Sequence, residues 1–169
     1  MTLSLYEIAL PTSVRMLSNL SHLLDKAKSH GGGEAEAYLE ARLAPDMLPL
    51  SRQIQIASDS AVRGAARLAG VEPPSMPDTE VTIADLRARL AKAIAYLESF
   101  KPAQISDDAG RKIELSFPGR TVTFTAKEFI FNFTLPNLFF HVVTAYDILR
   151  AQGVPLGKLD YLNGAPATA

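Results

Sequence analysis

The stretch TLPNLFFHVVTAYDILR, residues 134–150, decides how the last part of the chain folds. It lies in the most apolar region of the sequence, yet it contains Pro136, Asn137 and His141. On a helix, 100° per residue places Thr134, Asn137 and His141 in one narrow stripe. Pro136 removes a backbone hydrogen-bond donor, which predicts a kink one turn before His141. We interpret the segment as a core helix with an inward-facing polar stripe.

Length and composition predict one soluble globular domain, which we place at residues 1–165. The 169 residues are 47% hydrophobic and 21% charged, an ordinary mixture for a globular protein. A net charge of −1 and scattered basic residues argue against a nucleic-acid partner. The absence of cysteine excludes disulfides, thiolate nucleophiles and sulfur-ligated metals.

The sequence also favours a cytoplasmic protein without a membrane partner. Its first residues, MTLSLYEIALPTSVRM, lack the basic start, apolar run and cleavage site of a signal peptide. No run approaches eighteen uncharged apolar residues, because Asn132, Asn137 and His141 interrupt the apolar stretch at 129–145.

Apolar residues at three- and four-residue spacing predict four long helices, at about 11–30, 46 or 48–68, 83–100 and 126–151. Pro11 is expected at the first position of the first helix, where its missing N–H costs nothing. Pro49 is expected in the first turn of the second helix, with Asp46 as a candidate cap. A short helix is expected over 34–44.

Two capping-box patterns mark helix starts, Thr82 with Asp85 and Thr125 with Glu128. Between the third and fourth helices, residues 111–125 alternate between apolar and polar, which predicts a β-hairpin with its turn at Pro118–Gly119. The tail after Gly153 is apolar enough to pack back on the body. The expected fold is mainly α, a four-helix bundle with a small β-hairpin inserted before the last helix.

Few other side chains suggest chemistry. His22 has polar neighbours at helical spacing and is interpreted as a surface residue, and His30 ends a helix, where a cation favours the dipole. Asp46, Asp59 and Asp85 are the carboxylates expected near the core, although Asp85 is better explained as a cap. No glycine-rich phosphate loop and no nucleophile elbow is present.

Three segments together resemble a known family. They are RLAPDMLPLSRQIQIASD (42–59), PNLFFHVVTAYDILR (136–150) and GVPLGKLDYL (153–162). They resemble an uncharacterised bacterial and fungal domain-of-unknown-function family within the DinB/YfiT-like superfamily of four-helix bundles. The resemblance covers nearly the whole chain and implies a homodimer, since related bundles often pair.

The superfamily implies a metal site that this sequence matches only in part. Its metal-binding members hold zinc or nickel with one histidine on the second helix and a His-x-x-x-His pair on the last. Several act as thiol-dependent transferases or isomerases. Here His141 stands at the second position of that pair and Asn137 at the first, while Gln53 or Asp46 is the nearest polar candidate on the second helix. Amides are weak zinc ligands, so metal-dependent chemistry is in doubt.

Three interpretations of the stripe stay open. The first is a non-catalytic or degenerate-site bundle with a small ligand pocket at His141, Asn137, Gln53 and Thr134, with Tyr146 as a weaker member. The second is a zinc- or nickel-dependent enzyme of the thiol-transferase or hydrolase type, with the metal on His141, Asn137 and Asp46. The third makes the stripe a hydrogen-bonded core network. No cofactor is required by the first and third interpretations, and whether the protein is an enzyme is left open.

Overall fold

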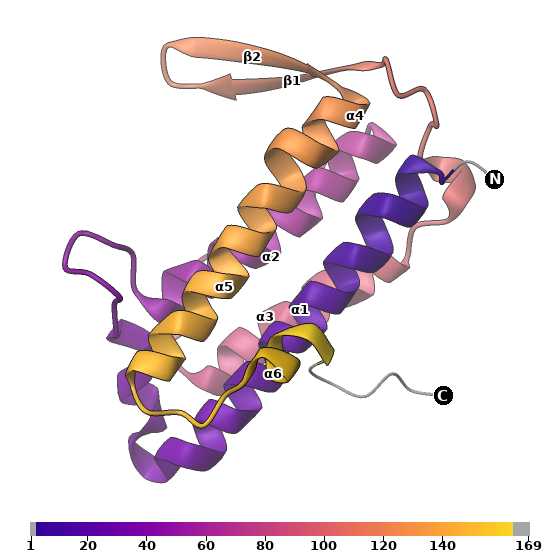
Figure 1. Cartoon of the computed structure of the whole chain (residues 1–169). Helices are drawn as coiled ribbons and strands as arrows, with labels where there is room; N and C mark the ends of the chain where they lie inside the picture. Colours follow the sequence, from indigo (N-terminus) through magenta and orange to yellow (C-terminus); the bar gives the residue numbers. More distant parts are fainter. Residues whose placement is uncertain (1–2, 164–169) are drawn as a thin grey trace.

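Four long helices lie side by side and form the body of the protein (Figure 1). They are α1 (Leu5–Gly31), α2 (Leu50–Ala69), α3 (Ile83–Glu98) and α5 (Leu135–Ala151). The computed structural model of the chain describes residues 3–163. Both α1 and α2 pack against α3 and α5, so the helices follow the ring order α1–α3–α2–α5. The predicted mainly helical bundle is confirmed.

The first helix begins at Leu5, so the predicted start at Pro11 is wrong. Ser4 caps it: its Oγ accepts from the Glu7 backbone N–H at 3.1 Å, and a Glu7 carboxylate oxygen accepts from the Ser4 N–H at 2.8 Å. Pro11 lies inside the helix and deprives the Glu7 carbonyl of its usual donor. Since Glu7 and Pro11 are both exposed, water can replace that donor.

The second helix, by contrast, starts later than predicted, because Pro49 is its N-cap residue and Leu50 its first helical residue. The Leu50 N–H donates to the Ala41 carbonyl at 2.9 Å, which ties the helix start to the preceding segment. Asp46 is an exposed residue of the loop before this point and does not cap the helix. The short helix expected over 34–44 is instead a 3₁₀ helix, η1 (Gly32–Glu40).

Both predicted capping boxes are present, at Thr82 with Asp85 and at Thr125 with Glu128. The predicted hairpin is also confirmed, as β1 (Lys112–Phe117) and β2 (Arg120–Thr125). Its apolar residues face one another across the strands, with Ile113 opposite Phe124 and Leu115 opposite Val122. A short 3₁₀ turn, η2 (Pro102–Gln104), lies between α3 and the hairpin.

The last long helix is interrupted before Pro136. After the short α4 (Ala126–Glu128), the π-helical segment η3 (Phe129–Thr134) leads into α5, of which Pro136 is the second residue. The Leu135 N–H donates to the Ile130 carbonyl, five residues back instead of four. The disturbance predicted at Pro136 therefore takes the form of a widened turn, a feature often found at functional sites.

The tail packs back on α1, as predicted, through the short helix α6 (Lys158–Asn163; Figure 1). The Asp160 carboxylate accepts from His22 Nε2 and Lys26 Nζ, each at 3.0 Å. Burial alone would raise the pKa of Asp160, but hydrogen bonds from the Gly157 N–H, Lys26 and His22 outweigh it and hold that pKa at about 2. His22, predicted as a surface residue, is half-buried at this contact.

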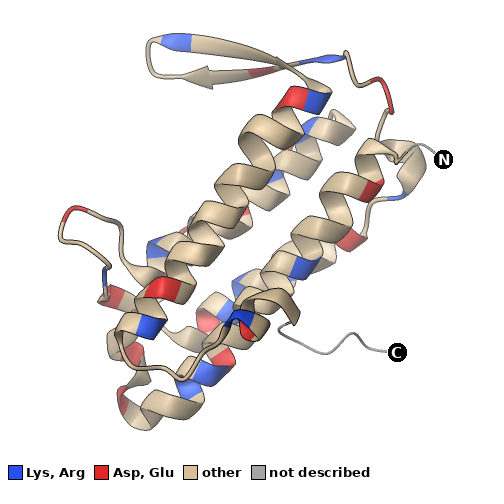
Figure 2. Ribbon diagram, viewed as in Figure 1, with Lys and Arg blue, Asp and Glu red and all other residues tan. Residues whose placement is uncertain are grey.

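Acidic and basic residues are both spread over the helices and loops, as Figure 2 shows along the ribbon. One helical stretch, Ala126–Ala151, is long and apolar enough to cross a membrane, with a mean hydropathy of 1.2. Half of its most apolar window is buried inside the protein, and core helices of soluble proteins pass the same test.

Candidate functional site in the α2–α5 interface

The polar stripe of α5 faces α2 along its whole length. His141 pairs with Gln53, Asn137 pairs with Ser60, and Thr134 lies against Gly64. The residue numbers rise along one helix as they fall along the other, so the two helices are antiparallel here. The residues of α2 that face this stripe are Gln53, Ser60 and Gly64, of which Gln53 lies in the first turn of the helix.

His141 is held in one orientation by Gln53. Its Nδ1 lies 2.7 Å from the Gln53 amide oxygen, while the Gln53 amide nitrogen donates to the Leu48 carbonyl at 3.0 Å. An amide oxygen can only accept, so Nδ1 carries the proton and Nε2 presents a lone pair in the neutral ring. Burial lowers the pKa of His141, which favours this neutral form.

Closer to the hairpin, the stripe forms part of a cavity. The Asn137 side-chain N–H₂ donates to Ser60 Oγ at 2.7 Å. Thr134 is only 4% exposed, and within residues 3–163 its hydroxyl has no hydrogen-bond partner. A buried hydroxyl without a partner costs free energy unless a ligand or water satisfies it. Thr134, Asn137 and Ser60 all line the same cavity, which we call the α2–α5 cavity.

The α2–α5 cavity has a volume of about 380 Å³, within the range of small-molecule sites. Helix α2 forms one wall, and the hairpin, η3 and the start of α5 form the others. The lining residues are Ile56, Asp59, Ser60, Arg63, Gly64, Arg67, Leu115, Ser116, Phe117, Phe129, Phe133, Thr134 and Asn137. Gln53 and His141 lie further along the same helix pair and do not line this cavity.

One wall of the cavity is aromatic. The rings of Phe129 and Phe133 are stacked with their centroids 5.9 Å apart, and Phe117 meets Phe133 edge-on at 6.3 Å. Phe129 and Phe133 are four residues apart in η3, so both lie on the same side of the helix. Phe124 of the hairpin packs behind both rings and fixes them.

The opposite wall carries charge. Asp59, Arg63 and Arg67 follow one another at four-residue spacing on α2. Arg63 Nη2 lies 3.0 Å from one Asp59 carboxylate oxygen, and Arg89 Nη2 lies 2.6 Å from the other. Asp59 is thus neutralised from both sides, and Arg67 has no carboxylate within ion-pair distance among the described residues.

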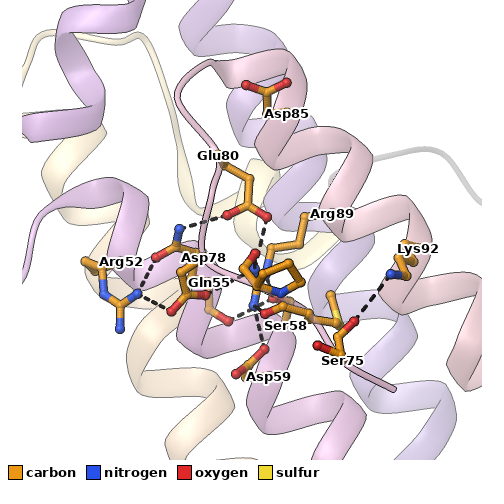
Figure 3. A network of polar contacts seen from close by, with 12 residues as sticks. Arg52, Gln55, Ser58, Asp59, Ser75, Asp78, Glu80, Asp85, Arg89 and Lys92 are labelled. Atoms are coloured by element: carbon orange, nitrogen blue, oxygen red, sulfur yellow. Dashed lines mark hydrogen bonds and ion pairs between the residues drawn. The ribbon is translucent and has the colours of Figure 1, made fainter. Parts of the chain in front are cut away.

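Asp59 belongs to a larger polar network centred on Arg89 (Figure 3). The Arg89 side chain is 2% exposed and donates to Ser58 Oγ at 2.7 Å and to a Glu80 carboxylate oxygen at 2.9 Å. It also donates to the carbonyls of two residues in the loop between α2 and α3, Met76 and Pro77. The network joins that loop to the back of the α2–α5 cavity.

The metal site implied by the resemblance does not fit these residues. His141 is the one imidazole available, Asn137 turns its amide nitrogen to Ser60, and Asp46 is an exposed loop residue. Gln53 already uses its amide oxygen on the His141 ring. Within residues 3–163, no three His, Cys, Asp or Glu side chains stand close enough to hold an ion together. Zinc sites need three good protein donors, so we assign no metal here.

Sequence reasoning identified part of this region and missed part of it. The predicted candidates Gln53 and His141 contact each other, and Asn137 and Thr134 line one cavity. Tyr146 is partly buried, and in the described part of the chain no hydrogen bond joins it to the stripe. Sequence analysis missed the residues of the charged and aromatic walls, namely Ser60, Arg63, Arg67, Arg89, Phe117, Phe129 and Phe133. Arg89 falls at a position of the apolar face of α3. This placement predicts a buried arginine, and a buried arginine needs charged or polar partners.

Comparison with known proteins agrees with this fold. A crystal structure of a DinB family member protein from Shewanella denitrificans superposes with a TM-score of 0.85. It shares 40% sequence identity, and the match covers 98% of this chain and 95% of that chain. No curated protein matches. The profile of the domain of unknown function DUF1993 matches residues 5–162. The chain therefore belongs to the DUF1993 family of DinB-like helical domains.

Proposed function

We propose that this protein binds a small molecule in the α2–α5 cavity and carries out no metal-dependent reaction there. The observation that supports this most directly is that Thr134, a residue lining the cavity, has a buried hydroxyl without a hydrogen-bond partner among residues 3–163. The Ser60 hydroxyl and the Asn137 amide oxygen add further polar groups on the same surface. A few placed polar groups on a largely apolar wall are typical of ligand sites.

Gln53 and His141 take a positioning role in this proposal. Their hydrogen bond joins α2 and α5 beyond the cavity and sets the register in which Ser60 meets Asn137. The neutral imidazole that burial favours adds no charge to the interface. A buried polar pair that fixes one arrangement of two helices is a known use of such groups.

Amide chemical shifts can locate ligand binding. We expect a panel of one- and two-ring aromatic compounds, neutral, cationic and anionic, to shift the backbone amides of the cavity-lining residues. Ser60→Leu should abolish these shifts by filling the cavity, whereas Ser51→Leu, on the same helix outside the lining, should retain them. If no member of the panel shifts the cavity residues, the proposed function is wrong.

Metal analysis separates this proposal from the alternative of a zinc- or nickel-dependent enzyme. Protein purified without a histidine tag, then incubated with zinc or nickel and dialysed, should contain far less than one equivalent of either metal, because one imidazole and amide donors bind them weakly. His141→Ala should leave that content unchanged. Stoichiometric metal that is lost in His141→Ala would support the enzyme instead.

We also propose that the protein is a cytoplasmic homodimer. Exposed Phe140 and Val143, three residues apart on α5, and exposed Phe131 in η3 supply apolar surface of the kind that subunits bury. Light scattering at micromolar concentration should give the mass of two chains, and the mass of one chain would contradict the proposal.

A further inference from the structure

The α2–α5 cavity is lined by a cation, Arg67, that forms no ion pair among the described residues. Within residues 3–163 Arg67 forms no ion pair, and its one hydrogen bond runs from Nη1 to the Arg63 carbonyl at 3.5 Å. Arg67 is half-buried, and its stem lies on α2 one turn beyond Arg63. A guanidinium in this position retains most of its donors for a bound group.

The carboxylate nearest to Arg67 along the helix does not compete for it. Asp59 has both oxygens engaged, one by Arg89 and the other by Arg63. Burial and the neighbouring Arg63 both lower the pKa of Arg67, and Glu72 offsets this only in part. An added anion would relieve both effects. Charge balance in the cavity therefore favours a negatively charged group beside Arg67.

The remainder of the cavity suits an aromatic body. Phe117, Phe129 and Phe133 form a wall of offset and edge-on rings, an arrangement that accepts one more ring. Leu115 and Ile56 extend the apolar surface. The volume of about 380 Å³ accommodates a one- or two-ring compound rather than a nucleotide or a peptide.

Building on the proposed binding function, we infer that the ligand is a small aromatic carboxylate. Its carboxylate group binds the Arg67 guanidinium, with Arg63 beside it, and its ring packs on the accessible faces of Phe117 and Phe133. The Thr134 hydroxyl and the Asn137 amide oxygen bind a polar substituent near the ring. Arginine recognises a carboxylate through two parallel N–H donors, which also fixes the orientation of the ring.

Matched probes test the charge directly. Phenylacetate and 1-naphthylacetate are compared with phenylacetamide and 1-naphthylacetamide, which have the same shape and no charge. We expect the carboxylates to bind at least about tenfold more tightly than the amides, as shown by amide-shift titrations. Arg67→Gln should remove that preference and change the affinity for the amides by less than about twofold.

Arg150→Gln is the matched control, since Arg150 is exposed on α5 and lies outside the lining of the cavity. It removes the same charge and should leave both affinities unchanged. Thermal unfolding of Arg67→Gln should match that of the wild type, which excludes loss of folding as the cause. If the amides bind in the cavity as tightly as the carboxylates, the anionic ligand is excluded while the binding function stands. If none of the four probes binds there, the aromatic carboxylate is excluded, and the wider panel decides separately whether the binding function is wrong.

Discussion

Replacing Arg89 with methionine should lower the free energy of unfolding by about 3 kcal/mol, among the largest effects of any single substitution in this chain. Methionine keeps most of the apolar stem and removes the guanidinium. The expected loss comes mainly from the carboxylates left without a partner. Glu80 has an 11% exposed side chain, and Asp59 a 22% exposed one.

The expected loss of about 3 kcal/mol is at the low end of values for buried ion pairs. The carboxylates are partly exposed to water, and two of them keep another arginine as a partner. Asp59 keeps its contact with Arg63. Asp78, whose carboxylate lies 3.2 Å from Arg89 Nη1, keeps its ion pair with Arg52. Glu80 depends most on Arg89. Burial would raise the pKa of Glu80, but hydrogen bonds from Gln55 and Arg89 outweigh this and lower it. Without Arg89, Glu80 is the carboxylate whose pKa should rise most.

Urea denaturation of Arg89→Met and of Lys92→Met provides the comparison. Lys92 lies one turn further along α3, is exposed, and makes one long hydrogen bond, 3.4 Å, to the Ser75 carbonyl. Its replacement should cost less than about 0.5 kcal/mol. Hydrogen exchange in the loop 70–82 should accelerate in Arg89→Met, because two loop carbonyls lose their donor. Equal stability of the two variants would mean that the network adds nothing to folding.

The network also links stability to the proposed site. Arg89 holds Asp59, and Asp59 holds Arg63 at the cavity wall. Because Arg89 and Arg63 already pair with Asp59, Arg67 is not needed as a partner of this carboxylate. Its guanidinium can therefore bind an anion in the cavity. Burying the charge of Arg89 costs free energy of folding, but its pair with Asp59 leaves the cavity wall with an excess of positive charge.

The local rules of helix and hairpin formation predicted most of the fold. The capping boxes at Thr82 and Thr125 gave the correct helix starts, since each pattern satisfies two backbone donors without any tertiary contact. The same pattern at Ser4 and Glu7 was overlooked because Pro11 suggested a later start. Packing of the first turns outweighs the preference of Pro11 for a helix start, since Leu5, Ala9 and Leu10 are buried in the core.

The candidate site was only partly predictable. A helical projection placed Thr134, Asn137 and His141 on one stripe, and all three do meet α2. The projection could not show that a π-helical segment ends at Thr134 and precedes Asn137 and His141, because apolar periodicity does not report the backbone hydrogen-bond pattern. Nor could it find Arg63 and Arg67, because arginines on the polar side of a helix have the same sequence pattern whether or not they border a cavity.

Gly64 of α2 lies in close contact with Thr134 at the end of η3, and its replacement by alanine should show how tightly this contact is set. A Cβ on Gly64 would lie 2.5 Å from Cγ2 of Thr134, too near for a stable contact. Thr134 is β-branched and buried, so its methyl group cannot move aside without changing rotamer. Alanine is the better helix former by about 1 kcal/mol, yet overpacking should outweigh this and leave a net loss of about 1–3 kcal/mol.

A double-mutant cycle isolates the clash. In Gly64→Ala with Thr134→Ser, the methyl group is gone and the nearest remaining contacts of the new Cβ would be 3.5 Å to the hydroxyl and 3.7 Å to Cβ. Stability should therefore reach at least that of Thr134→Ser alone and exceed it by up to about 1 kcal/mol, as measured by urea denaturation. Gly33→Ala is the control, since a Cβ there meets no atom within 4 Å. If Gly64→Ala is neutral by itself, the two helices are not held this close in solution, and the α2–α5 cavity would be wider than the volume on which the ligand size was argued.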